Sequence, residues 1–301
     1  MFTRRALLAS SFLLAALSPA LAAGEVKVVA SFSILADLVH EVGGDRVSVR
    51  TLVPVNGDAH VYQPTPNDSK AIAEANLVVF NGLTLEGWGD RLVSASGYKG
   101  PLLKASDGVT PRKAEGEEAK EHPGAPDPHA WQNVANVKTY VANIRDALIK
   151  VDPAGKADYE ARAAAYTKQL GDLDDLIRST YAGIPKSDRR MITTHDAFGY
   201  YAAAYGLEIL APQGTSTDSE PSAKQVAALV RQIKKEKIKA IFVENISDPR
   251  MTKRIADETK QQLGGTLYSD ALSPPDGPAG TYLTMMRNNL KLISAAMKGT
   301  V

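Results

Sequence analysis

The chain has 301 residues, of which 44% are hydrophobic and 23% are charged, a balance that excludes a disordered or fibrous protein. Its 35 lysines and arginines nearly cancel its 34 aspartates and glutamates, so no net charge indicates binding to nucleic acid or to an acidic membrane surface. The absence of cysteine excludes disulfides, iron–sulfur clusters, thiolate zinc sites and cysteine nucleophiles. It leaves five histidines as the source of any imidazole chemistry.

Residues 1–22 have the pattern of a secretory signal peptide. Arg4 and Arg5 precede an apolar stretch at residues 6–17, and the small-residue sequence Ala-Leu-Ala follows at 20–22. The stretch is shorter than the roughly 20 apolar residues that a membrane-spanning helix needs, and no later segment reaches that length. We therefore expect an exported protein that is soluble in the periplasm, with the paired arginines leaving the Sec and twin-arginine routes open.

Residues 23–150 alternate between strand-like and helix-like segments, as an α/β lobe with a parallel sheet does. The apolar, β-branched run Val26–Phe32 predicts a strand that is buried on both faces. The charged segment 112–128, rich in Pro, Gly and Glu, has no periodicity and predicts a mobile acidic loop. The other predicted elements of this lobe are a helix at 34–42, a strand at 47–52, a short helix at 68–75, a strand at 77–80 and a helix at 133–150.

Residues 151–183 predict one unusually long linking helix. The helical pattern runs from about Pro153 to Tyr181, and Gly183 and Pro185 end it. A helix of roughly 28 residues would be about 42 Å long, which is enough to join two lobes rigidly.

Residues 184–301 repeat the alternation and predict a second lobe. Its predicted elements are strands at 190–194, 207–211 and 240–244, and helices at 197–205, 223–236, 250–263 and 281–297. The predicted fold class is therefore α/β, with two lobes that are each a mainly parallel sheet flanked by helices. In open α/β sheets ligands bind at the carboxyl ends of the strands, so the crevice between the lobes is the expected site.

Four polar side chains are predicted to reach this crevice. His60 lies in the loop after the second strand, and His129 lies in the loop PDPHAWQNV. His195 directly follows a strand, and Asp270 follows an apolar pair in the same kind of position. Neutral imidazoles and a carboxylate are common ligands of first-row metals where thiolates are absent. None of the four is within local ligand spacing of another, so spacing alone leaves an ordinary structural role open for each.

A few other residues invite the same question. We expect His40 to have a structural role in its helix, and Trp88 and Trp131 to serve in packing. Asp196 and Glu244 are candidates to orient a ligand imidazole, which metal-bound histidine usually requires.

Six motifs in chain order, spread over nearly the whole mature chain, resemble the zinc/manganese-binding solute-binding proteins of ABC importers (cluster A-I, or cluster 9). They are HVYQPTPND, NGLTLEGW, DPHAWQNV, THDAFGYYAAAYGL, FVENISDPR and LYSDALSPPDGPAGTYLTMMRNNL. The resemblance implies a metal held between two lobes that are joined by one long rigid helix. The family's two histidine ligands are matched by His60 and His129, its third ligand (His or Glu) by His195, and its fourth (Asp or Glu) by Asp270.

The resemblance also bears on the metal. Three imidazoles resemble the zinc members, whereas two histidines with a glutamate and an aspartate resemble manganese or iron importers. Zinc accepts four-coordinate shells of nitrogen and oxygen, while manganese prefers more oxygen and higher coordination. We therefore predict Zn²⁺, with an importer component for Mn²⁺ or Fe²⁺ as the alternative. Zinc members often carry a His-rich loop where this chain has Glu115, Glu117, Glu118, Glu121 and His122. A single histidine there puts metal storage by the loop in doubt, and a solvated acidic loop is the other interpretation.

The predicted function is capture and delivery of the metal. Zn²⁺ would exchange its waters for the four side chains, and a membrane permease would read the closed state, with only modest lobe movement because the linking helix is stiff. Imidazoles must be neutral to bind, so affinity should fall below about pH 6. The expected partners are the permease and ATPase of a metal importer, with a periplasmic metallochaperone as a further candidate and no nucleic acid. We expect a monomer.

Two other classes would use the same residues. A zinc hydrolase with three histidines would keep an open fourth position to activate water, but Asp270 closes that position and no general base is evident. A periplasmic metal buffer or surface adhesin would keep the site without any transport. We therefore predict that the protein is not an enzyme.

Overall fold

The structure is a computed structural model that describes residues 25–113, 124–238 and 240–300. The predicted signal peptide and the glutamate cluster around His122 lie outside the described residues. Among the described helices, none combines the length and the apolar character that crossing a membrane would require.

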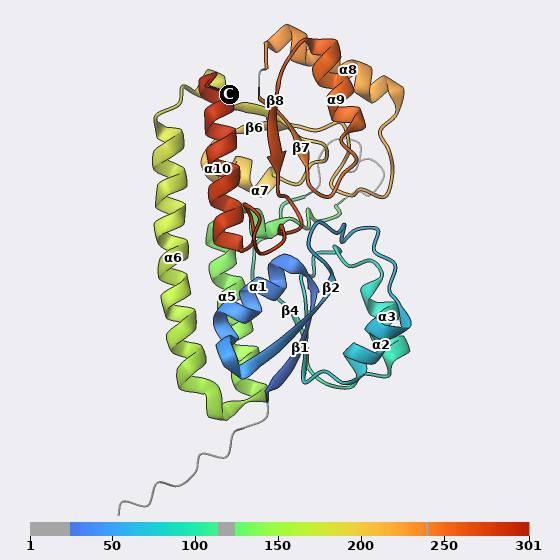
Figure 1. Ribbon diagram of the computed structural model, residues 1–301, viewed down its shortest axis with the longest axis vertical. Coiled ribbons are helices and arrows are strands. Elements are labelled where there is room, and N and C mark those ends of the chain that lie inside the picture. The colour runs from blue at the N-terminus through green and yellow to red at the C-terminus, as the bar shows by residue number, and fades with distance from the viewer. Residues whose placement is uncertain (1–24, 114–123, 239, 301) are drawn as a thin grey trace, which may run out of the picture.

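The first sheet has four parallel strands in the order β2-β1-β3-β4. The strands are β1 (Val26–Phe32), β2 (Val47–Val53), β3 (Leu77–Phe80) and β4 (Leu102–Lys104). In β1 every residue except Lys27 is buried, as the continuous apolar run predicts for a central strand. The helices α1 (Ser33–Gly43), α2 (Pro66–Ala73) and α3 (Gly89–Ser96) flank this sheet (Figure 1).

The second sheet repeats the plan, with the parallel order β6-β5-β7-β8. Its strands are β5 (Arg190–Ile192), β6 (Glu208–Leu210), β7 (Ala240–Glu244) and β8 (Leu263–Leu267). The accompanying helices are α7 (Gly199–Tyr205), α8 (Ala223–Glu236), α9 (Arg250–Thr259) and α10 (Tyr282–Lys298). The predicted fold class, two parallel sheets flanked by helices, is therefore confirmed.

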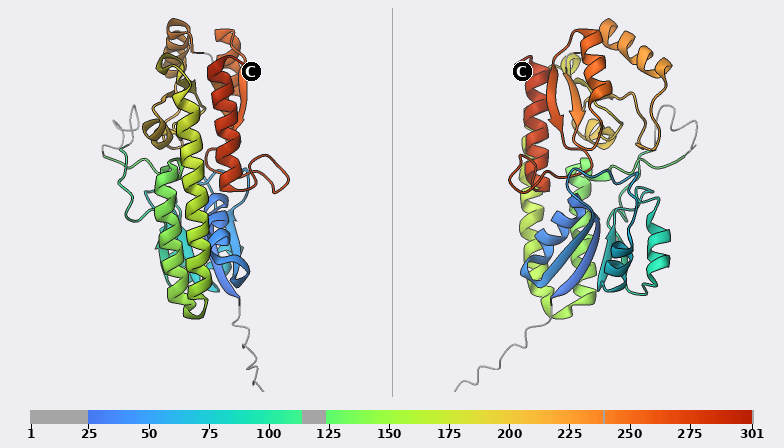
Figure 2. Two further views of the ribbon diagram at one scale, coloured as in Figure 1. Left: turned by 90° about the vertical axis from the view of Figure 1, so that its left-hand side faces the viewer. Right: turned by 45° about the vertical axis from the view of Figure 1, so that its right-hand side comes forward.

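The long helix α6 (Lys156–Ala182) runs beside both sheets. A 3₁₀ turn at Pro153–Gly155 connects it to α5 (Val134–Val151). The helix therefore begins at Lys156, three residues after the predicted start at Pro153. Its 27 residues correspond to about 40 Å. Figure 2 shows α6 beside α5 on the first lobe and beside α10 on the second. Its buried residues recur at intervals of three and four, which places them on one face: Tyr159, Ala163, Tyr166, Leu170, Leu173, Ile177 and Tyr181.

One hydrophobic core extends from the first sheet across the helices to the second lobe. It contains Phe32 of β1, Leu170 of α6 and Met285 of α10. A smaller cluster lies under α8 and α9 and includes Ile233 and Ile255. The lobes are thus joined by packed apolar side chains along the helical side, and the division of the chain at residues 150 and 183 stays a prediction.

Three elements were not predicted, and one helix is shorter than expected. The helix predicted at 250–263 ends at Thr259, because Lys260 adopts a left-handed conformation with φ 58°. Residues 263–267 form β8 instead, although its Gly264 and Gly265 are poor strand formers. The short elements α3 and β4 were also missed.

Candidate metal centre

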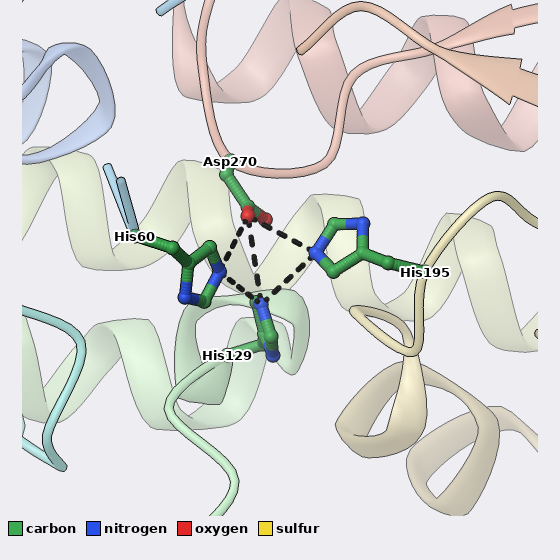
Figure 3. A group of neighbouring side chains, drawn as sticks. All are labelled: His60, His129, His195 and Asp270. Carbon is green, nitrogen blue, oxygen red and sulfur yellow. Dashed lines mark hydrogen bonds and ion pairs between the residues drawn. The ribbon is translucent and has the colours of Figure 1, made fainter. Parts of the chain in front are cut away.

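Four side chains from four separate segments meet at the junction of the two lobes (Figure 3). His60 lies in the loop after β2, and His129 immediately precedes the 3₁₀ turn Ala130–Gln132 that leads into α5. His195 follows β5, and Asp270 follows β8. The structure therefore brings together all four residues that the sequence nominated.

The Oδ2 atom of Asp270 lies at the centre of the contacts. It is 3.1 Å from the Nε2 of His60, 3.5 Å from that of His129 and 3.2 Å from that of His195. The Nε2 of His129 is 3.3 Å from the Nε2 atoms of both other histidines. All four ligand atoms lie within 4.8 Å of one another.

These separations match the edges of a small coordination polyhedron. A regular tetrahedron around an ion with bonds of about 2.0–2.1 Å has edges of about 3.3–3.4 Å. Five of the six separations between the ligand atoms are between 3.1 and 3.5 Å. The sixth, between His60 and His195, is within 4.8 Å. The four side chains could thus hold one metal ion between them.

The group is almost completely shielded from solvent. The side chains of His129, His195 and Asp270 are 0% exposed, whereas that of His60 is 5% exposed. The second oxygen of Asp270, Oδ1, is buried and has no hydrogen-bond partner. A buried carboxylate oxygen without a partner is energetically costly, and a bound metal would remove that cost. Oδ1 is therefore available as an additional metal ligand.

Carboxylates orient two of the three imidazoles. The Nδ1 of His129 lies 2.8 Å from Asp127 Oδ1, and the Nδ1 of His195 lies 2.6 Å from Glu244 Oε2. Each carboxylate favours a proton on Nδ1 and thereby leaves the Nε2 lone pair directed at the centre of the group. Glu244, which the sequence nominated for this role, therefore holds His195, whereas Asp127 was missed because it lies in an irregular loop.

The charges of the group stabilise one another in the absence of metal. Burial lowers the pKa of His129, but the carboxylates of Asp270 and Asp127 outweigh it and raise that pKa to about 9. Burial opposes protonation of His195 too, yet Glu244 and Asp270 raise its pKa well above the ordinary value. Burial would raise the pKa of Asp270, but His129 and His195 hold it well below its usual range. A metal cation would therefore replace bound protons.

The remaining candidates lie outside the group. His40 is exposed in the last turn of α1. Trp88 and Trp131 are buried and do not point a ligand atom at the centre, but each indole N–H anchors a ligand loop. Trp88 donates to the carbonyl of Ala59 at 2.8 Å, next to His60, and Trp131 donates to that of Ser269 at 2.9 Å, next to Asp270.

Comparison with known proteins places the chain among metal transport components. It matches the protein family described as zinc-uptake complex component A, periplasmic, over residues 28–296. The metal ABC transporter substrate-binding lipoprotein FimA of Streptococcus parasanguinis is 32% identical over 282 residues, covering 92% of this chain and 90% of that protein. The manganese ABC transporter substrate-binding lipoprotein PsaA of Streptococcus pneumoniae is 31% identical over 279 residues, covering 91% and 89%.

Solved structures of metal-binding proteins are also similar to this chain. The periplasmic zinc binding protein TroA from Treponema pallidum has a TM-score of 0.85 and 31% identity, covering 91% of this chain and 99% of that one. A Mn-bound periplasmic metal binding protein from Candidatus Liberibacter asiaticus has a TM-score of 0.81 and 31% identity, covering 91% and 100%. The chain therefore belongs to the zinc-uptake complex component A family, whose members are metal substrate-binding proteins of ABC transporters, with a permease and an ATPase as partners, and not enzymes.

Proposed function

We propose that this protein captures Zn²⁺ with His60, His129, His195 and Asp270 and delivers it to the permease of an ABC importer. The observation that carries the proposal is the spacing of the four ligand atoms, because five of their six separations fit the edges of a tetrahedral zinc shell. Three imidazoles and one carboxylate complete that shell, so no open position is left for an activated water.

Zinc is favoured by the donor set. Three of the four ligand atoms are imidazole nitrogens, which suit zinc better than manganese. Manganese is the second candidate, because the free Oδ1 of Asp270 would supply another oxygen and because PsaA is named as a manganese protein. Zn²⁺ binds most nitrogen and oxygen sites more tightly than Mn²⁺, so a preference for zinc in vitro does not decide the metal carried in the cell.

The proposed place of action is the periplasm, with a soluble monomer as the delivering form. FimA and PsaA are named lipoproteins. The 301 residues of this chain include no cysteine, so none of these residues can carry a lipid on a cysteine sulfur. A periplasmic metallochaperone that loads the site remains part of the proposal and is tested by zinc transfer between purified proteins.

Calorimetric titration of zinc into three single variants tests the ligand assignment. His60→Ala, His129→Ala and His195→Ala should each lose most of the zinc affinity, because each removes one bond to the metal. The control is His40→Ala, which removes an exposed imidazole outside the group and should bind zinc as the unaltered protein does. Unchanged affinity in two of the three ligand variants would end the assignment.

A further inference from the structure

The segment that carries Asp270 is attached mainly to the first lobe, although it belongs in sequence to the second. It connects β8 to α10 and begins at Tyr268, which exchanges two hydrogen bonds with Asn289 of α10. Beyond that point most of its hydrogen bonds to other segments cross the junction; the exception is the bond from Asn245 of the second lobe to the Ala271 carbonyl. Its hydrogen bonds to the first lobe involve Trp131, Gln132, Ser33, Asn56 and Asp37.

The contact closest to the ligand is a carbonyl that is held by two donors. The backbone oxygen of Ser269, the residue before Asp270, accepts the indole N–H of Trp131 at 2.9 Å and the side-chain amide of Gln132 at 2.7 Å. All three residues are 0% exposed. Trp131 itself packs on Phe32 at the end of β1, with ring centroids 4.9 Å apart, so the donors are fixed to the first sheet.

His195 differs in this respect. The backbone N–H groups of Thr194 and His195 donate to Glu244 at the end of β7, so this ligand is held by the second sheet. Next to Asp270, the Ala271 carbonyl also accepts the side-chain amide of Asn245 in the second lobe at 3.2 Å. The hydrogen bonds of Ser269 and Leu272 nevertheless tie the segment to the lobe that carries His60 and His129.

We infer that Trp131 and Gln132 are positioning residues that fix Asp270 on the first lobe through the Ser269 carbonyl. This inference rests on the proposed function, because it assigns how one proposed ligand is held. Neither residue touches the metal. Their action is to keep the Asp270 carboxylate at the distance from His60 and His129 that a single ion requires.

The shared acceptor gives the inference a distinctive signature. Removing one donor leaves the carbonyl with the other, whereas removing both leaves a buried carbonyl without a partner. Because the carbonyl keeps one partner in each single variant and an orphaned buried group costs more than one lost hydrogen bond, we expect each single variant to weaken zinc binding by at most about threefold and the double variant by at least about thirtyfold.

The variants are Trp131→Phe, Gln132→Met and the two combined, each of which replaces the N–H donor with an apolar side chain. Tyr181→Phe is the control, because it removes a buried hydroxyl bonded to Tyr201 at 2.9 Å in a contact that involves no ligand loop. Zinc affinity and the visible absorption of bound Co²⁺ are measured together. In the double variant the Co²⁺ bands should weaken as water joins the metal in place of a well-held carboxylate, a change that general destabilisation does not produce.

Additive losses in the double variant, or an unchanged Co²⁺ spectrum, would overturn the inference. Should the double variant fail to fold, spin labels in the cysteine-free chain decide the matter. Labels at Lys70→Cys on α2 and Asp276→Cys in the Asp270 segment should keep the same separation with and without zinc. This holds whether or not the separation between the two lobes changes, which labels at Lys70→Cys and Lys234→Cys on α8 report. A change in the first separation on metal removal would overturn the inference. Failure of the unaltered chain to bind zinc would instead reject the proposed function, and the label distances would still report where the segment lies.

Discussion

The carboxylate of Glu244 contacts its neighbours with both oxygens, and this makes its replacement by glutamine informative. Oε1 accepts the backbone N–H groups of Thr194 at 2.7 Å and His195 at 2.9 Å, while Oε2 lies 2.6 Å from the Nδ1 of His195. The side chain is 0% exposed, so water cannot substitute for either oxygen. As a carboxylate, Glu244 can accept on both sides at once.

Glu244→Gln preserves the shape but leaves only one acceptor oxygen. If the amide oxygen retains the two backbone N–H groups, the amide NH₂ faces Nδ1 of His195 and forces the ring proton onto Nε2, which then cannot bind a metal. Loss of such an outer partner typically lowers metal affinity about 10–100-fold, so we expect a loss of about 1.4–2.7 kcal/mol of binding free energy.

Competition titration of zinc against a chelator measures the loss, and Asp127→Asn provides the matched control. Asp127 uses one oxygen, Oδ1, for both the backbone N–H and the Nδ1 of His129, at 2.9 and 2.8 Å. The amide oxygen of asparagine can keep both contacts, so this variant should lose much less affinity. An affinity for Glu244→Gln within about threefold of the unaltered protein, or an equal loss in Asp127→Asn, would refute the tautomer argument.

Three further predictions concern protons and the closed state. Because the pKa of metal-free His129 is raised to about 9 and that of His195 is raised well above its ordinary value, zinc displaces protons from both. Affinity should therefore rise by at least about tenfold per pH unit up to pH 9, not only near pH 6. Titration in buffers of different ionisation enthalpy should detect the released protons, and none at pH 7 would contradict this. Burial raises the pKa of Asp37 from 3.8 to about 7, so the stability that this group contributes is present below pH 4 and lost as pH rises through 7. Asp37→Asn should therefore raise the free energy of unfolding at pH 8 by up to about 4 kcal/mol and leave it nearly unchanged at pH 4. Urea unfolding of the metal-free protein can measure both values. The hydroxyl of Thr217 donates across the junction to Asp58, which lies two residues before His60, at 2.7 Å. Thr217→Val should therefore speed zinc dissociation about two- to tenfold with little change in Tm. An unchanged rate in stopped-flow chelation would show that this contact has no role in metal retention.

Much of the fold follows from local pattern. The continuous apolar runs predict β1, β3 and β7 with correct ends, because strands buried on both faces cannot alternate. The predicted convergence of His60, His129, His195 and Asp270 rests on the family resemblance and on the rule that parallel strands present their following loops at one edge.

Other features depend on tertiary contacts that no local pattern encodes. The glycines of β8 leave a weak strand signal, and only pairing with β7 defines it. Asp127 lies in an aperiodic loop, and its role appears only when its carboxylate meets His129. Likewise, the sequence assigns Asp270 to the second lobe, whereas the hydrogen bonds of Trp131 and Gln132 attach its loop to the first.

The most direct test of the proposed function is the metal content of the protein purified from the periplasm without added metal. The proposal predicts one zinc ion per chain, and strongly reduced zinc in His129→Ala purified in the same way. Abundant manganese without zinc would contradict the choice of metal, and equal zinc in the two proteins would contradict the site.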